Sequence, residues 1–149
     1  MEVNHMTQKD SIKLLRECEA GCAMGISSID EILDKVRDDK YVKILLESKD
    51  HHDKLKNEIH NLLVQAGSDD KEPSMMAEAM ASMKTMFKMN MNESDQTAAD
   101  LIVSGCQMGI RSLHKYKNKY ANAGHTATDI CNRLLDIEDE LCHKSFAYL

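Results

Sequence analysis

The segment GCAMGI at residues 21–26 recurs as GCQMGI at residues 105–110, and this repetition indicates how the chain folds. Each copy lies at the same place in a long segment whose apolar residues recur at helical spacing, so the two copies mark an internal repeat. We therefore predict two related helical hairpins, one over residues 11–66 and the other over residues 95–149.

The apolar pattern of the first hairpin predicts two helices joined by a polar turn at residues 37–40. In the first helix, Ile12, Ile26 and Leu33 share a row with Glu19, and the neighbouring row is Leu15, Cys22, Ile29 and Val36. The second helix runs to about residue 66, where Gly67 supplies a stop signal. Its expected core stripe is Tyr41, Leu45, Ser48, His52, Leu55, Ile59 and Leu62.

The second hairpin repeats this pattern. A helix is predicted over residues 95–120, and a break follows at residues 123–125. Thr126 and Thr128 are candidate N-caps of the last helix. Its expected apolar stripe is Ile130, Leu134, Ile137, Leu141 and Tyr148.

The composition favours an all-α protein and excludes several classes of function. The 149 residues fit a single domain over residues 1–149, and they include no tryptophan, one proline and 4% aromatic residues. A net charge of −6 with scattered basic residues argues against nucleic-acid binding. No apolar run approaches the ~20 residues of a membrane span, and no export signal is present, so we expect no membrane contact and a cytoplasmic location. The five cysteines are an odd number without a CxxC pair, which favours reduced thiols.

The connection over residues 67–94 is too long for a simple turn. Pro73 suits the first position of a helix, and the following residues predict a short Met-rich helix within this connection. If the connection travels the length of the bundle, the two hairpins form a ferritin-like four-helix bundle with one long crossover. A plain up-down-up-down bundle is the alternative.

Each repeated segment contains Gly-x-x-x-Gly, which removes side-chain bulk from one side of a helix. Because glycine within a helix costs about 1 kcal/mol relative to alanine, its placement there indicates tight helix packing or contact with a ligand. Tight packing would bring the two central cysteines near each other. The residues assigned to packing or ligand contact are Gly21, Cys22, Gly25, Gly105, Cys106 and Gly109.

A ferritin-like bundle raises the question of a di-iron centre, which uses a Glu from each of two helices and Glu-x-x-His from the other two. Val103 occupies the position in the second repeat that corresponds to Glu19, so we predict that the di-iron ligand set is incomplete. Iron is therefore expected only under the alternative function. The candidate metal ligands are Glu19, His52, Glu140 and His143.

Seven of the eleven methionines lie within residues 75–91. Thioethers can bind Cu(I), but methionine is also a flexible packing residue on adaptable apolar surfaces, and no adjacent His or Cys completes a copper site. We interpret Met80, Met83 and Phe87 as a surface that covers the bundle or contacts a second chain, and we expect a homodimer.

The segment MASMKTMF at residues 80–87, together with residues 105–110 and ILDKV at residues 32–36, resembles a group of small uncharacterised cytosolic proteins from anaerobic Gram-positive bacteria. That group has no assigned activity to carry over. No complete catalytic signature is present in the sequence. We therefore expect a cytosolic binding or interaction module without intact di-iron chemistry, whose ligand and protein partner are unknown; the alternative is a metal-binding, ferritin-like redox or storage protein.

Overall fold

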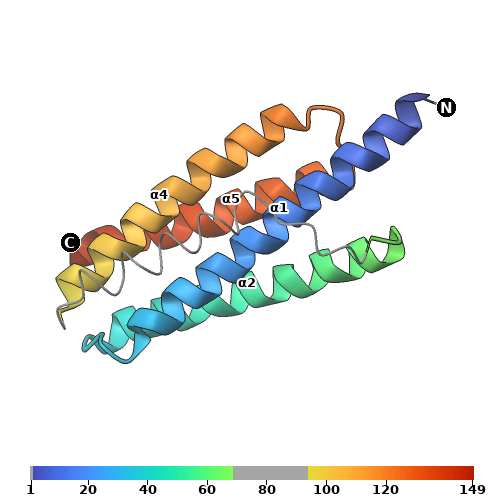
Figure 1. Cartoon of the computed structure of the whole chain (residues 1–149). Helices are drawn as coiled ribbons and strands as arrows, with labels where there is room; N and C mark the ends of the chain where they lie inside the picture. The colour runs from blue at the N-terminus through green and yellow to red at the C-terminus, as the bar shows by residue number, and fades with distance from the viewer. Residues whose placement is uncertain (1, 69–93) are drawn as a thin grey trace.

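The computed structural model describes residues 2–68 and 94–149, with side chains from residue 8 onward. These residues form four long α-helices packed together as a bundle (Figure 1). The helices are α1 (Glu2–Leu33), α2 (Asp39–Gln65), α4 (Asp95–Lys119) and α5 (His125–Ser145), and a short 3₁₀ helix, η1 (Phe146–Tyr148), follows α5. The all-α prediction is confirmed.

Local sequence determines where the described helices begin and end. Asp38 caps α2 by accepting a hydrogen bond from the Tyr41 N–H at 2.9 Å, and Ser94 caps α4 in the same way. Gly67 follows α2 with a φ of +72°, which suits the predicted stop. The predicted N-caps of the last helix are wrong, because Gly124 is the N-cap and both threonines lie inside the first turn.

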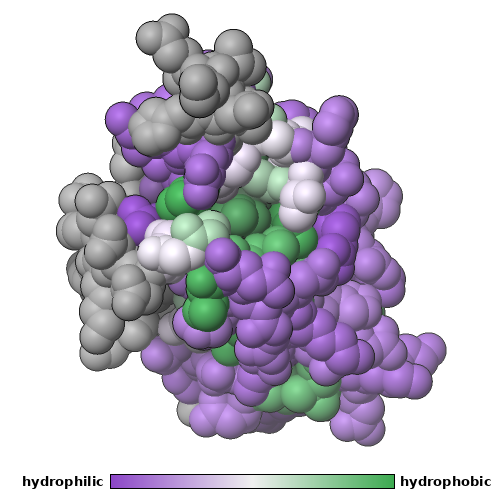
Figure 2. Space-filling model, turned by 90° about the vertical axis from the view of Figure 1, so that its right-hand side faces the viewer, coloured by the Kyte–Doolittle hydropathy of each residue, from purple (hydrophilic) through white to green (hydrophobic). Residues whose placement is uncertain are grey.

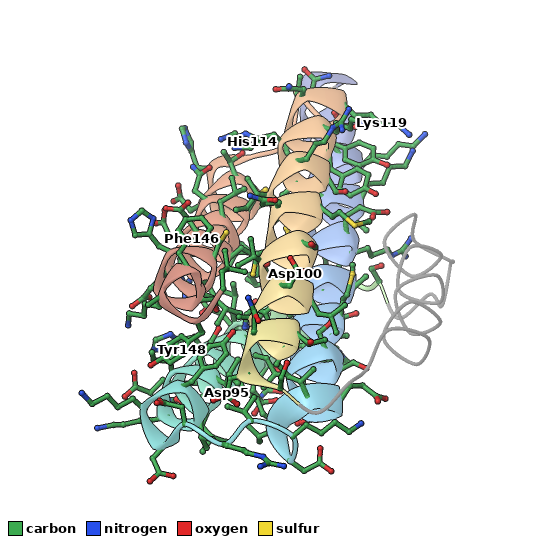
Figure 3. All side chains as sticks on the ribbon, turned by 90° about the vertical axis from the view of Figure 1, so that its left-hand side faces the viewer. Asp95, Asp100, His114, Lys119, Phe146 and Tyr148 are labelled. Carbon is green, nitrogen blue, oxygen red and sulfur yellow. The ribbon has the colours of Figure 1, made fainter. Side chains whose placement is uncertain are left out.

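One end of the bundle joins the turn after α1 to the start of α4. The Asp95 carboxylate accepts the backbone N–H of Arg37 at 2.7 Å and that of Asp38 at 3.0 Å. At the same end, the rings of Tyr41 and Tyr148 stack with centroids 4.2 Å apart. Figure 3 shows Asp95 and Tyr148 at this end, far from Lys119 at the other end of α4.

The opposite end of the bundle joins the first half of α1 to the end of α2 and to the turn between α4 and α5. Arg16 donates to the Ser68 hydroxyl, and the Asn122 N–H donates to Asp10 at 3.1 Å. The end of α2 and the start of α4 therefore lie at opposite ends of the bundle (Figure 1).

The core lies along the bundle axis, where α1 and α5 each pack against all three other helices. Of the two rows predicted for α1, the row containing Leu15 and Cys22 is buried, whereas Glu19 and its row are only half-buried. The stripe predicted for α2 is confirmed, except that Leu63 is buried in place of Leu62. Burial of a Leu or Ile side chain contributes about 1.5–3 kcal/mol, so these rows account for much of the packing energy.

The face of the molecule that Figure 2 shows is mostly hydrophilic. On the face in Figure 2, hydrophobic residues gather in a hollow near the centre, within a hydrophilic rim. Some large hydrophobic side chains are exposed, among them Leu46, Val64 and Met108. None of the described helices contains an apolar stretch that could cross a bilayer.

Candidate ligand-binding site

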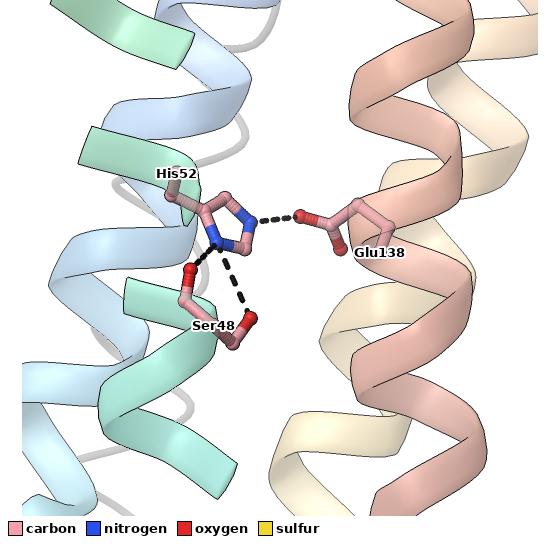
Figure 4. A network of polar contacts seen from close by, with 3 residues as sticks. All are labelled: Ser48, His52 and Glu138. Carbon is pink, nitrogen blue, oxygen red and sulfur yellow. Dashed lines mark hydrogen bonds and ion pairs between the residues drawn. The ribbon is translucent and has the colours of Figure 1, made fainter. Parts of the chain in front are cut away.

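A buried histidine and a buried glutamate form an acid–base pair between α2 and α5 (Figure 4). His52 Nε2 lies 2.8 Å from Glu138 Oε1, and the side chains are 0% and 10% exposed. The other ring nitrogen, Nδ1, lies 2.7 Å from the backbone oxygen of Ser48, one turn earlier in α2. Both nitrogens of the imidazole are therefore hydrogen-bonded, which fixes the orientation of the ring.

These contacts determine how many protons the pair holds. A carbonyl oxygen only accepts hydrogen bonds, so His52 Nδ1 carries a hydrogen and donates it to Ser48. The short contact between Nε2 and Oε1 also requires one proton between them, since two lone pairs would repel. The pair is therefore either imidazolium with carboxylate or imidazole with carboxylic acid. Its net charge is zero in both forms.

The surroundings of His52 shift the pKa of its ring in opposite directions. Burial, the largest effect, favours the neutral ring, whereas the hydrogen bond and charge of Glu138 and the Ser48 carbonyl favour the charged ring. The balance raises the pKa of His52 above its usual value. Stabilisation of the imidazolium by Glu138 and the Ser48 carbonyl together thus outweighs the desolvation of the ring.

The second glycine of each repeated segment makes room for one member of this pair. A methyl group added to Gly25 in α1 would place its carbon 2.5 Å from the Cδ2 and Nε2 atoms of His52. The equivalent addition to Gly109 in α4 would lie 3.3 Å from Glu138 Oε2. At these two positions, the missing side chains accommodate polar groups from α2 and α5. The space that was predicted to serve tight helix packing or a ligand is bordered, at these two positions, by side chains of neighbouring helices.

A cavity of about 30 Å³ lies between α1, α4 and α5. All four glycines of the repeated segments line it, and Glu138 is its charged wall residue. Most of the remaining lining is apolar and includes Met24, Leu101 and Leu134. The half-buried residues Ser28 and Gly105 place part of the cavity near the surface. The described lining offers one hydrogen-bonding carboxyl group in a mostly apolar space that small residues leave open.

The cysteines near this site are buried thiols. Burial, the charge of Glu138, the charge of Cys142 and a hydrogen bond with Glu138 raise the pKa of Cys106 far above its usual value. Burial, together with the charge of Glu138, raises the pKa of Cys22 to about 12. Because the thiolate is the nucleophile, these two thiols are poorly suited to nucleophilic chemistry. Cys106 lines the cavity.

The structure gives the four predicted metal ligands separate environments. Glu19 pairs with His60 at 3.5 Å, and His52 pairs with Glu138. Glu140 forms an exposed ion pair with Lys144 at 2.8 Å, whereas the ring of His143 lies 5.5 Å from that of Phe146. Within residues 8–68 and 94–149, no group of three His, Cys, Asp or Glu side chains could hold a metal ion. The predicted partner surface of Met80, Met83 and Phe87 lies outside the described residues.

Sequence reasoning missed Glu138, which is the residue that most defines the site. The apolar stripe of the last helix assigned Ile137 to the core, but Ile137 is half-buried and Glu138 is buried. The signal was present in the spacing, because residue 138 lies four residues after Leu134 and three before Leu141. A search restricted to apolar residues passes over a carboxylate in such a row.

Comparison with known protein families, curated proteins and solved structures found no match to this chain.

Proposed function

We propose that this protein is a binding module that takes a compact ligand, or the end of a longer one, into the glycine-lined cavity. The observation that supports this proposal most directly is the position of Glu138, a buried carboxyl group in the wall of an otherwise mostly apolar cavity. A ligand that suits these walls has a small apolar body and one hydrogen-bond donor directed at Glu138.

The size of the cavity limits the ligand. A water molecule needs roughly 10–15 Å³, so 30 Å³ accommodates about two waters or a group of two to three non-hydrogen atoms. Very small ligands gain at most about 1.5 kcal/mol per non-hydrogen atom. A ligand of about three such atoms is therefore expected to bind with a Kd of roughly 0.5 mM or weaker. Tighter binding requires a longer molecule that also contacts the rim near Ser28.

Titration of the full-length protein with small probes, followed by amide NMR, tests the proposal. Ethanol, ethylammonium and acetonitrile are of similar size, and acetonitrile lacks a strong donor. We expect at least one of the two donor probes to shift the amide signals of Gly21 and Gly105 in a saturable manner. Acetonitrile should have a much weaker effect, because it offers Glu138 no hydrogen bond.

Two variants localise the binding. Gly105→Ala adds a methyl group at a residue that lines the cavity, and a cost of about 1–3 kcal/mol to accommodate the ligand beside it should weaken binding by about 5- to 150-fold. Ser104→Thr is the matched control, because it adds a methyl group to the same helix at a residue that does not line the cavity. If no donor probe binds, or if both variants respond alike, the cavity is not the binding site.

We also propose that the bundle is ferritin-like and derives from a duplicated hairpin. Two features support this view: the repeated glycine segments line the same cavity, and the end of α2 lies opposite the start of α4. This architecture requires no di-iron chemistry, because function depends on the site rather than on the fold.

A further inference from the structure

We propose that the cavity selects neutral hydrogen-bond donors, such as alcohols and primary amides, over ammonium ions. This inference rests on the proposed function and specifies the chemical class of its ligand. Glu138 is the acceptor, and its Oε2 atom is the one that faces Gly109. His52, which lies behind the carboxyl group and binds Oε1, supplies the internal countercharge.

The selectivity follows from the net charge of the buried pair. A lone buried carboxylate would favour a cation, because the cation would neutralise it. Here the proton held between His52 and Glu138 already leaves the pair neutral. An ammonium ion in the cavity would add a buried charge without a counterion, which is strongly unfavourable, whereas a neutral donor adds none.

Among the residues that the structure describes, Glu138 is the one charged residue in the lining, so none of them compensates for a bound cation. Within residues 8–68 and 94–149, the other titratable residue in the lining is Cys106, and its raised pKa keeps the thiol neutral. The apolar residues of the lining, such as Leu101 and Leu134, cannot solvate an ion. Discrimination between neutral and charged donors is therefore assigned to the histidine–glutamate pair.

His52 cannot readily leave Glu138 when a ligand enters. Its Nδ1 donates to the Ser48 carbonyl, and its ring fits closely against Gly25, where an added methyl carbon would lie at only 2.5 Å. Turning the ring away would break both hydrogen bonds in a buried environment. His52 thus acts as a specificity-determining residue that does not itself line the cavity.

The test compares ethanol with ethylammonium, which are alike in size and differ in charge. With the wild-type protein at neutral pH, amide NMR should give an affinity for ethanol at least about tenfold higher than for ethylammonium. His52→Gln leaves Glu138 without its countercharge and should reverse the preference. His51→Gln is the matched control, because His51 is exposed on the same helix, and it should leave the preference unchanged.

If His52→Gln does not fold, the comparison of the two probes with the wild-type protein still decides the selectivity, and a second variant checks that the acceptor oxygen of residue 138 holds the ligand. Glu138→Gln retains an acceptor oxygen, so ethanol should still bind and ethylammonium should remain the weaker ligand. Equal or tighter binding of ethylammonium by the wild-type protein would overturn the selectivity and leave the proposed function intact. Failure of both probes to bind would instead refute the proposed function itself.

Discussion

The middle of α1 and the middle of α4 have nearly the same sequence, yet they face opposite halves of an acid–base pair. Gly25 lies against the ring of His52, and Gly109 lies against the carboxyl group of Glu138. A shared local motif therefore supplies the same thing in both helices, which is space. The chemistry that fills the space comes from α2 and α5.

The side chains beside the two glycines also differ in how far they can move. The His52 ring is held by hydrogen bonds at both nitrogens and is 0% exposed, so it cannot move without breaking a contact. The Oε2 atom of Glu138 is at the end of a longer side chain that borders the cavity. The space beside Gly25 is therefore more sharply constrained than the space beside Gly109.

The largest expected effect is that of breaking the pair. His52→Leu leaves Glu138 buried without its main partner, and the loss of one member of a buried pair costs about 3–5 kcal/mol. His51→Leu changes an exposed histidine in the same helix and should alter the free energy of unfolding by less than about 0.5 kcal/mol. Urea denaturation measures both values. Similar losses in the two variants would show that the buried pair has no special role in stability.

Alanine substitutions at the two glycines test the comparison directly. Gly25→Ala should lower the free energy of unfolding by about 1–3 kcal/mol, because its methyl group would overlap the fixed ring of His52. Gly109→Ala gains about 1 kcal/mol of helix propensity and meets a carboxylate oxygen that can shift, so its net effect should be near zero or stabilising. Thermal and urea denaturation of both variants would decide, and equal effects would contradict the asymmetry.

The pH dependence of stability should report the charge on His52. Its pKa is raised in the folded state, so its stabilisation is complete below the unfolded-state value of about 6.5 and is lost as the pH rises through the folded-state value. The free energy of unfolding should therefore fall above about pH 6.5, by about 1.4 kcal/mol for each unit of the pKa increase. Denaturation curves of His52→Gln should lack this decline. An identical pH profile in that variant would assign the decline to another group.

The smallest effect is expected at an exposed ion pair between α2 and α5. Arg133 donates to both carboxylate oxygens of Glu58 at 2.9 and 2.8 Å, and its hydrogen bond holds the pKa of Glu58 below the usual value. Both side chains are about half exposed, so Glu58→Gln should cost only about 0.2–1 kcal/mol. This loss should vanish near 1 M salt, whereas that of His52→Leu should persist. If the loss of stability in Glu58→Gln does not depend on salt, the exposed Glu58–Arg133 pair and the buried His52–Glu138 pair do not differ in the way proposed.

The sequence determined the helices and most of the core, because helical periodicity is a local property of the chain. The stripe from Tyr41 to Ile59 in α2 and the row containing Cys22 in α1 were predicted from spacing alone and are buried. Gly67 marked the end of α2 because glycine, which has no side chain, readily adopts a positive φ. The start of α5 was predicted less well, because a threonine suits the first turn of a helix as well as its cap.

Only the tertiary structure decided which polar residues meet. His52 and Glu138 are 86 positions apart, and no local pattern pairs them. The spacing argument that placed His52 in the core also placed Glu19 in a core row, and the Glu-x-x-His pattern suggested Glu140. These two glutamates pair with His60 and Lys144 instead. Helical spacing limits which face of a helix a residue occupies, but the packing of α1, α2, α4 and α5 determines what that face meets. The cavity between the repeated glycines arises for the same reason, since its walls come from three helices that are brought together only by folding.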